Sequence, residues 1–89
     1  MGTAGIKIKL MPLSPEVNLE EIKNNAKALI EEKGGKNCRF EEEPIAFGLK
    51  AIMVYFDWPE EKELEELENK LKEIKNINSA EIVDMRRLL

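Results

Sequence analysis

The stretch LKAIMVYFDW, residues 49–58, constrains the fold of this chain more than any other segment. It is almost continuously apolar and rich in β-branched and aromatic residues, which suit a pleated, buried surface. A run of this length and composition is typical of a strand inside a sheet. We therefore expect residues 49–58 to form a central strand.

Three other segments have the pattern of strands. Residues 6–11, IKIKLM, alternate apolar side chains with lysines at a period of two, as a half-buried strand does. Residues 37–43 alternate around Cys38 and Phe40, and residues 79–85 alternate less regularly. These segments are expected to join the central strand in one sheet.

Two segments have the apolar spacing of amphipathic helices. The first follows Asn18, whose side chain can cap its N-terminus, and ends at Gly34-Gly35. The second has an apolar stripe that consists of Leu64, Leu67, Leu71 and Ile74. Pro59 suits the first turn of this second helix, because its φ is helical and its missing N–H would have no partner there.

The predicted order is strand, helix, strand, strand, helix, strand. The two middle strands are close enough in sequence for a hairpin, and each helix joins strands that need a crossover connection. With right-handed crossovers, this order closes as a four-stranded antiparallel sheet with both helices on one face. We therefore predict a ferredoxin-like α+β sandwich, βαββαβ, that occupies residues 1–89 as a single domain.

Composition argues against several kinds of function. At 43% hydrophobic and 36% charged residues, the chain has no apolar run near the ~20 residues of a membrane-spanning helix. Its N-terminal MGTAGIKIKL lacks a secretory signal pattern, because lysines interrupt the apolar residues. With no histidine and only Cys38, neither an ordinary zinc site nor a nucleophile with its base is expected. We expect a cytoplasmic, non-enzymatic protein that holds no metal and no cofactor.

The negative charge is concentrated in one segment. The net charge is −4, and residues 57–75 carry eight acidic side chains against four lysines, whereas the remainder is balanced. A protein whose excess charge is acidic has no general attraction for a phosphate backbone. We therefore expect no direct binding to nucleic acid, and none to a membrane.

The connection between the middle strands, EEEPIAFGLK, residues 41–50, is unusually apolar for a loop. Pro44 restricts φ and Gly48 allows unusual backbone angles, so this loop can hold one shape. Two explanations are open for Ile45 and Phe47. Either they fold back and cap the end of the core, or they form an exposed apolar plug for a partner's pocket.

Arg86 and Arg87 near the C-terminus also have two explanations. They are solvated surface cations, or they contact a partner. In the predicted topology, the end of the last strand and the connection between the middle strands can lie at the same end of the sheet. We then expect Phe47 and an arginine to form one contact patch.

Two segments resemble a known family. The stretch EEEPIAFGLKAIMVYF, together with the ending SAEIVDMRRLL, is similar to the archaeal form of translation elongation factor 1-beta. The resemblance extends over the whole chain, from the MPLSPEV segment through both helices to the DMRRL ending. The EEEPIAFGLKA segment is its most specific part.

The resemblance implies guanine-nucleotide exchange on elongation factor 1-alpha, the GTPase that delivers aminoacyl-tRNA to the ribosome, by a factor that is monomeric when free. It implies that Phe47 wedges among elements near the GTPase's Mg²⁺ and phosphate site, and that Arg87 brings positive charge to the Mg²⁺ position. Eukaryotic members carry lysine at the position of Arg87. Lysine lacks the paired N–H donors of arginine, so the two are not interchangeable. Whether Arg86 or Arg87 acts therefore stays open. The implied contact residues are Ile45, Phe47, Gly48, Arg86, Arg87 and Leu88.

Two other functions are compatible with the fold. A non-exchange binding module would sense a small ligand or bind RNA, with Tyr55 and Phe56 as its aromatic residues. A small hydrolase would use Arg86 and Arg87 as an anion site, although the sequence offers no nucleophile pattern for it. Ligand-dependent melting, salt-dependent RNA binding and hydrolysis of an acyl phosphate distinguish these functions from nucleotide exchange.

Overall fold

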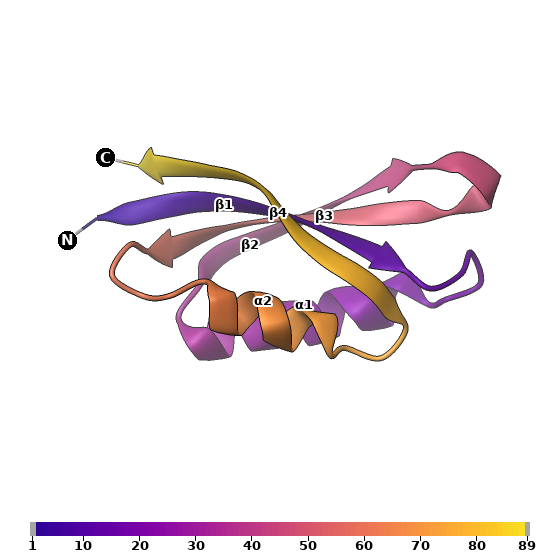
Figure 1. Ribbon diagram of the computed structural model, residues 1–89, viewed down its shortest axis with the longest axis horizontal. Coiled ribbons are helices and arrows are strands. Elements are labelled where there is room, and N and C mark those ends of the chain that lie inside the picture. Colours follow the sequence, from indigo (N-terminus) through magenta and orange to yellow (C-terminus); the bar gives the residue numbers. More distant parts are fainter. Residues whose placement is uncertain (1, 89) are drawn as a thin grey trace.

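The computed structural model describes residues 2–88, which form one antiparallel sheet and two helices. The strands are β1 (Thr3–Pro12), β2 (Lys36–Pro44), β3 (Lys50–Pro59) and β4 (Ile77–Leu88), and the helices are α1 (Leu19–Lys33) and α2 (Glu65–Lys72). The strand order across the sheet is β2-β3-β1-β4, and both helices cover one face (Figure 1). The predicted ferredoxin-like sandwich is confirmed.

The segment from Lys50 to Pro59 is a central strand, as predicted, because β3 pairs with both β1 and β2. Its helix-facing side chains are buried: Ile52, Val54, Phe56 and Trp58. Ala51 and Met53, on the opposite face, are buried as well. Burial on both faces explains why this segment is nearly continuously apolar rather than alternating.

The core lies between β1, β3 and the two helices. Its fully buried members outside β3 are Ile8, Leu10, Ile22, Ala26, Ile30, Leu67 and Leu71. The rings of Phe56 and Trp58 meet edge to face, with centroids 5.9 Å apart. The apolar stripes that were predicted for both helices therefore point into one core.

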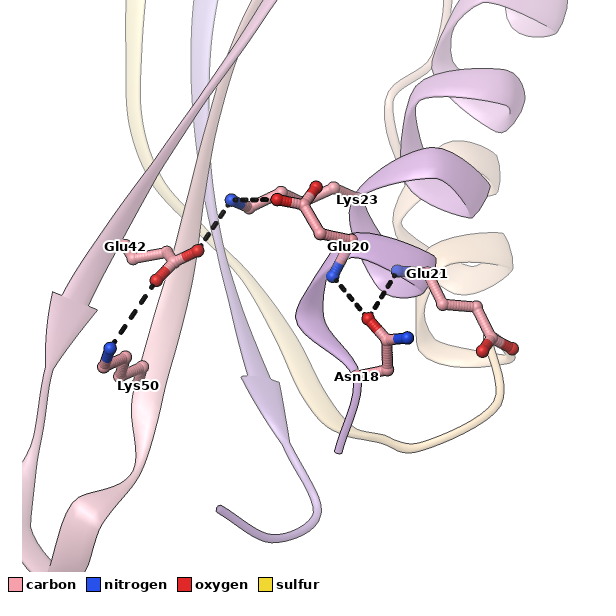
Figure 2. Close-up of polar contacts among 6 residues, drawn as sticks. All are labelled: Asn18, Glu20, Glu21, Lys23, Glu42 and Lys50. Atoms are coloured by element: carbon pink, nitrogen blue, oxygen red, sulfur yellow. Dashed lines mark hydrogen bonds and ion pairs between the residues drawn. The ribbon is translucent and has the colours of Figure 1, made fainter. Parts of the chain in front are cut away.

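The ends of α1 follow the predicted signals. The Asn18 side chain accepts hydrogen bonds from the N–H groups of Glu20 (3.0 Å) and Glu21 (3.3 Å), as Figure 2 shows. Gly34 ends the helix with φ 113°, a left-handed conformation that costs glycine little. No helix of residues 2–88 is long and apolar enough to cross a bilayer.

The prediction for Pro59 is wrong. Pro59 is the last residue of β3 and lies opposite Thr3, so its backbone is extended, and α2 begins only at Glu65. The intervening turn is held by hydrogen bonds from Lys62 N–H to the Pro59 carbonyl and from Trp58 Nε1 to the Lys62 carbonyl, both 3.2 Å. Strand pairing with β1 therefore continues past the point where the local pattern predicted a helix.

The sheet is longer than the helices that cover it. β4 has 12 residues and α2 has 8; at the usual rise per residue these are about 40 Å and about 12 Å long. Figure 1 shows the β2–β3 hairpin extending past the helices at one end of the molecule. The ribbon of β1 and β4 extends at the other end, where both termini lie. The molecule therefore measures 42 × 20 × 18 Å and presents two exposed ends.

Candidate functional site

The turn that joins β2 to β3 places Phe47 in solvent. Ala46–Gly48 form one 3-10 turn, which a 2.7 Å hydrogen bond from Ile45 N–H to the Leu49 carbonyl closes. Phe47 is 94% exposed. Ile45 is half-buried and is not among the side chains that pack against the core. Of the two explanations left open for this loop, the one in which it folds back and caps the core is therefore wrong for Phe47, whose ring is accessible to a partner.

Phe47 also adopts a backbone conformation that aromatic residues rarely take. Its φ of 63° and ψ of 29° lie in the left-handed region, and Gly48 follows with φ 78°. This region costs a residue other than glycine roughly 1–2 kcal/mol. An exposed ring recovers none of that cost through burial. The stability of the chain alone therefore does not explain a phenylalanine at this position.

A second loop lies beside this turn. Pro15, between β1 and α1, lies close to Gly48, because a Cβ on Gly48 would be 3.9 Å from the Pro15 Cβ. Leu13 in the same loop is 59% exposed. Sequence reasoning missed Leu13, because its exposure depends on how the loop meets the end of the sheet, and no local pattern signals it.

An ion pair holds the hairpin to the helical layer. Lys23 Nζ of α1 lies 2.7 Å from Glu42 Oε2 of β2 (Figure 2). This hydrogen bond lowers the pKa of Glu42 and raises the pKa of Lys23. A similar bond of 2.8 Å joins Lys33 of α1 to Glu66 of α2 and shifts their pKa values in the same two directions. These shifts belong to bonds between elements and not to a reactive cluster.

Arg87 lies at the end of the sheet opposite to the β2–β3 turn, on the helix-facing side of the sheet. It pairs in register with Ala4 of β1, and its Nε donates a 2.7 Å hydrogen bond to Glu60 Oε2. It borders a groove of about 370 Å³ beside Trp58. The Arg87 side chain is 73% exposed. It is therefore a surface cation with one defined protein partner among residues 2–88.

Arg86 lies on the uncovered face of the sheet. It pairs in register with Gly5, and its Nε donates a 3.0 Å hydrogen bond to Asp84 of its own strand. Successive residues of a strand point to opposite faces, so the two arginines cannot present their charges on the same side. Leu88 closes β4, and its side chain lies outside the part of the chain that the structure describes.

The groove beside Arg87 also has an apolar rim. Met85 lines it and is 58% exposed, and nearby Val83 of the same strand is 42% exposed. The register of β1 and β4 shifts at Val83, which marks a bulge. Sequence reasoning missed these two residues, because alternation along a strand does not show where its covering helix ends.

Phe47 and Arg87 lie at opposite ends of the molecule, so the hypothesis of one contact patch is wrong. Figure 1 shows the β2–β3 hairpin and the end of β4 at these two ends. Both β3 and β4 run antiparallel to β1. The start of β3, which the turn precedes, and the end of β4 must therefore lie at opposite ends of the sheet. Arg87 shares its row with Trp58, which lies about 26 Å along β3 from Lys50 at the usual strand rise.

The uncovered face of the sheet carries both signs of charge around Tyr55. The Lys7 ammonium lies 5.3 Å and the Arg39 guanidinium 5.7 Å from the centre of its ring. Asp57 and Asp84 line the same shallow groove. Phe56 is buried in the core, so the two aromatic residues of the RNA-binding alternative do not share a surface.

The described residues offer little for metal or covalent chemistry. No group of three or more His, Cys, Asp or Glu side chains within residues 2–88 could hold a metal ion. Cys38 is half-buried, and its burial raises the pKa of the thiol, which disfavours the reactive thiolate. The described residues thus form a small α+β domain with two exposed ends.

Comparison with known proteins identifies the family. The family model described as the EF-1 guanine nucleotide exchange domain matches residues 5–88. Elongation factor 1-beta of Pyrococcus abyssi is 43% identical over 83 residues, which cover 91% of this chain and 90% of that protein. The proteins of the same name from Methanocaldococcus jannaschii and Methanococcus maripaludis are 41% identical over 86 residues and 38% identical over 87. In both cases the match covers 96% of this chain and 97% of the relative.

The chain therefore belongs to the EF-1 guanine nucleotide exchange family. The resemblance that the EEEPIAFGLKA segment and the DMRRL ending indicated is confirmed.

Proposed function

We propose that this chain promotes the exchange of GDP for GTP on elongation factor 1-alpha, by binding and without covalent chemistry. The observation that carries the proposal is the match of residues 5–88 to the exchange-domain family. The exposed Phe47 and Arg87 support it, because both side chains are accessible to a partner. We further propose that residues 1–89 act as one domain in the cytoplasm and are monomeric when free.

Exchange by binding is a coupling between two ligands of the GTPase. A factor that binds the GTPase and weakens GDP must itself be weakened by GDP to the same extent. Ordinary coupling energies of ~1–3 kcal/mol correspond to roughly 5–150-fold changes in affinity. Released GDP is then replaced by GTP, whose binding displaces the factor.

Arg87 acts at the Mg²⁺ and phosphate site of the GTPase. A guanidinium is always charged and offers N–H donors that match carboxylate and phosphate oxygens. At that site it competes with Mg²⁺ for oxygen ligands, so GDP loses part of the interaction that retains it. We assign this role to Arg87 rather than Arg86, because Arg87 has an apolar rim beside it and a partner from another segment.

Phe47 docks on a separate part of the GTPase. Burial of an exposed phenylalanine ring contributes about 1.5–3 kcal/mol. This contact is made at a distance from the nucleotide, so it binds the GTPase equally well before and after GDP leaves. Such uniform binding lowers the concentration of factor that gives half-maximal exchange, but it does not raise the maximal rate of GDP release.

Release of labelled GDP tests the proposal. Elongation factor 1-alpha is loaded with labelled GDP, and release is followed after an excess of unlabelled GTP is added, with or without this chain. We expect faster release at a stoichiometric ratio; unchanged release would disprove the proposal. A parallel reaction with EDTA, which removes Mg²⁺ and so speeds spontaneous release, tests the mechanism. The factor should add less acceleration there if it acts through the Mg²⁺ site.

A further inference from the structure

Glu60 holds the Arg87 side chain from a neighbouring segment. Glu60 directly follows β3, and its Oε2 lies 2.7 Å from Arg87 Nε. The Glu60 side chain is only 29% exposed, whereas the Arg87 side chain is 73% exposed. The inner part of the arginine therefore rests on a partly buried carboxylate, while most of the side chain is in solvent.

The residue that precedes β1 helps to fix this carboxylate. Glu60 N–H donates a 3.0 Å hydrogen bond to the Gly2 carbonyl. A Cβ on Gly2 would lie 1.8 Å from Glu60 Oε1, a separation that no real side chain can adopt. A larger residue at this position would therefore displace the flexible end of the Glu60 side chain. The backbone of Gly2 thus anchors Glu60, and the Glu60 carboxylate positions the arginine.

The bond through Nε leaves the rest of the guanidinium for an external anion. Among residues 2–88, Arg87 donates its one side-chain hydrogen bond to Glu60, through Nε. An arginine has five N–H groups, so the four on its two terminal nitrogens stay available. These terminal groups are the ones that can bind a carboxylate or phosphate through two parallel hydrogen bonds.

Arg86 has no comparable partner from another segment among residues 2–88. Its partner Asp84 is two residues away on the same strand and is itself 45% exposed. The other Asp84 oxygen accepts a 2.9 Å hydrogen bond from Met85 N–H, which is also local. This contact therefore does not fix Arg86 relative to any other element.

We propose that Glu60, with Gly2, is a positioning residue that orders Arg87 before it meets the partner's anionic site. This inference rests on the proposed role of Arg87 in exchange. A long side chain that is free in solvent must lose its rotamer freedom on contact, and Glu60 removes much of that freedom beforehand. Glu60 acts through Arg87 and needs no contact with the GTPase.

The test compares Glu60→Gln in two backgrounds, the unsubstituted chain and Arg87→Met. The readout is the maximal rate of labelled GDP release from elongation factor 1-alpha at saturating factor. We expect Glu60→Gln to slow release about three- to tenfold when Arg87 is present. It should have no further effect in the Arg87→Met background. Glu61→Gln is the matched control, because Glu61 is exposed and makes no ion pair within residues 2–88.

Gly2→Ala provides an independent variant. It keeps the Glu60 charge but displaces its carboxylate, so it should slow release to a similar degree. Melting curves of all variants separate loss of fold from loss of positioning, and we expect unchanged melting temperatures.

Two outcomes overturn the proposal: no slowing by Glu60→Gln beside Arg87, or equal slowing in both backgrounds. If Arg87→Met alone releases GDP as fast as the unsubstituted factor, then the proposed role of Arg87 is wrong and the role of Glu60 falls with it. The Arg87→Met measurement needs no Glu60 variant, so failure of the proposed role of Arg87 is distinguishable from failure of the proposed role of Glu60.

Discussion

Glu42 lies closer to Lys23 of α1 than to Lys50 of its own hairpin. The Oε2–Nζ distance to Lys23 is 2.7 Å, whereas the Oε1–Nζ distance to Lys50 is 3.9 Å. Lys23 also lies 3.8 Å from Glu20 in the first turn of α1 (Figure 2). The hairpin that carries Phe47 is therefore tied to the helical layer, and this tie gives the fold a pH dependence.

We expect Glu42→Gln to lower the melting temperature near neutral pH but not in strong acid. The hydrogen bond from Lys23 lowers the pKa of Glu42 below its ordinary 4.5 and raises the pKa of Lys23 above 10.5. A lowered carboxyl pKa stabilises the fold above the unfolded value, and this contribution is lost as the pH falls through the folded value. A raised lysine pKa stabilises below 10.5 and is lost above it. The pair therefore contributes fully between about pH 4.5 and 10.5.

Melting curves across the acid range check this expectation. The difference between Glu42→Gln and the unsubstituted protein should shrink below pH 4.5 and vanish once Glu42 is protonated in the fold. Glu41→Gln is the control, because Glu41 is exposed and makes no ion pair within residues 2–88. A difference that stays constant with pH would show that Glu42 stabilises the hairpin in some other way.

Phe47→Gly should keep or slightly raise stability while it weakens exchange. Glycine relieves a left-handed strain of about 1–2 kcal/mol. It costs about 0.5–1 kcal/mol through the greater freedom of the unfolded chain. The expected net change is therefore ~0–1.5 kcal/mol of stabilisation, measured by denaturant unfolding.

In GDP release, the same substitution should raise the half-saturating concentration of factor about tenfold or more, because the buried ring is lost. Phe47→Tyr is the matched control, since it keeps the ring and should bind nearly as well. If Phe47→Gly keeps the half-saturating concentration of the unsubstituted factor, then Phe47 does not contact the GTPase.

The fold could be predicted wherever a local pattern has one physical meaning. Asn18 and Gly34 mark the ends of α1 because they satisfy orphan backbone groups there. The apolar run that ends at Trp58 identifies the central strand because both of its faces are buried. Pro59 was misassigned because pairing with Thr3, a long-range contact, decides its conformation.

Two features of the site were not predicted, for different reasons. The separation of Phe47 and Arg87 could have been predicted, since it follows from the topology in which β3 and β4 both run antiparallel to β1. Glu60 could not have been singled out, because it is one of many acids in residues 57–75. Only the register that brings Arg87 beside the end of β3 distinguishes it.

The two arginines should differ in exchange. We expect Arg87→Met to lower the maximal rate of GDP release about tenfold or more, within the usual range of coupling energies. Arg86→Met should change it less than about twofold, since Arg86 faces the uncovered side of the sheet and such surface changes are usually small. Arg87→Lys should retain part of the rate, because lysine keeps the charge but not the fork. A larger loss with Arg86→Met would reverse the assignment.

Combining Phe47→Ala with Arg87→Met tests whether the two ends act separately. Residues more than ~7–10 Å apart that share no partner usually contribute additively to within ~0.3–0.5 kcal/mol, which is about a factor of two. The loss in exchange efficiency, taken as maximal rate over half-saturating concentration, should therefore equal the product of the two single losses within about twofold. A double variant that is much less impaired than this product would mean that the two side chains serve one step at one place on the GTPase. Additive losses would instead require a partner surface that follows the 42 Å long axis of this molecule.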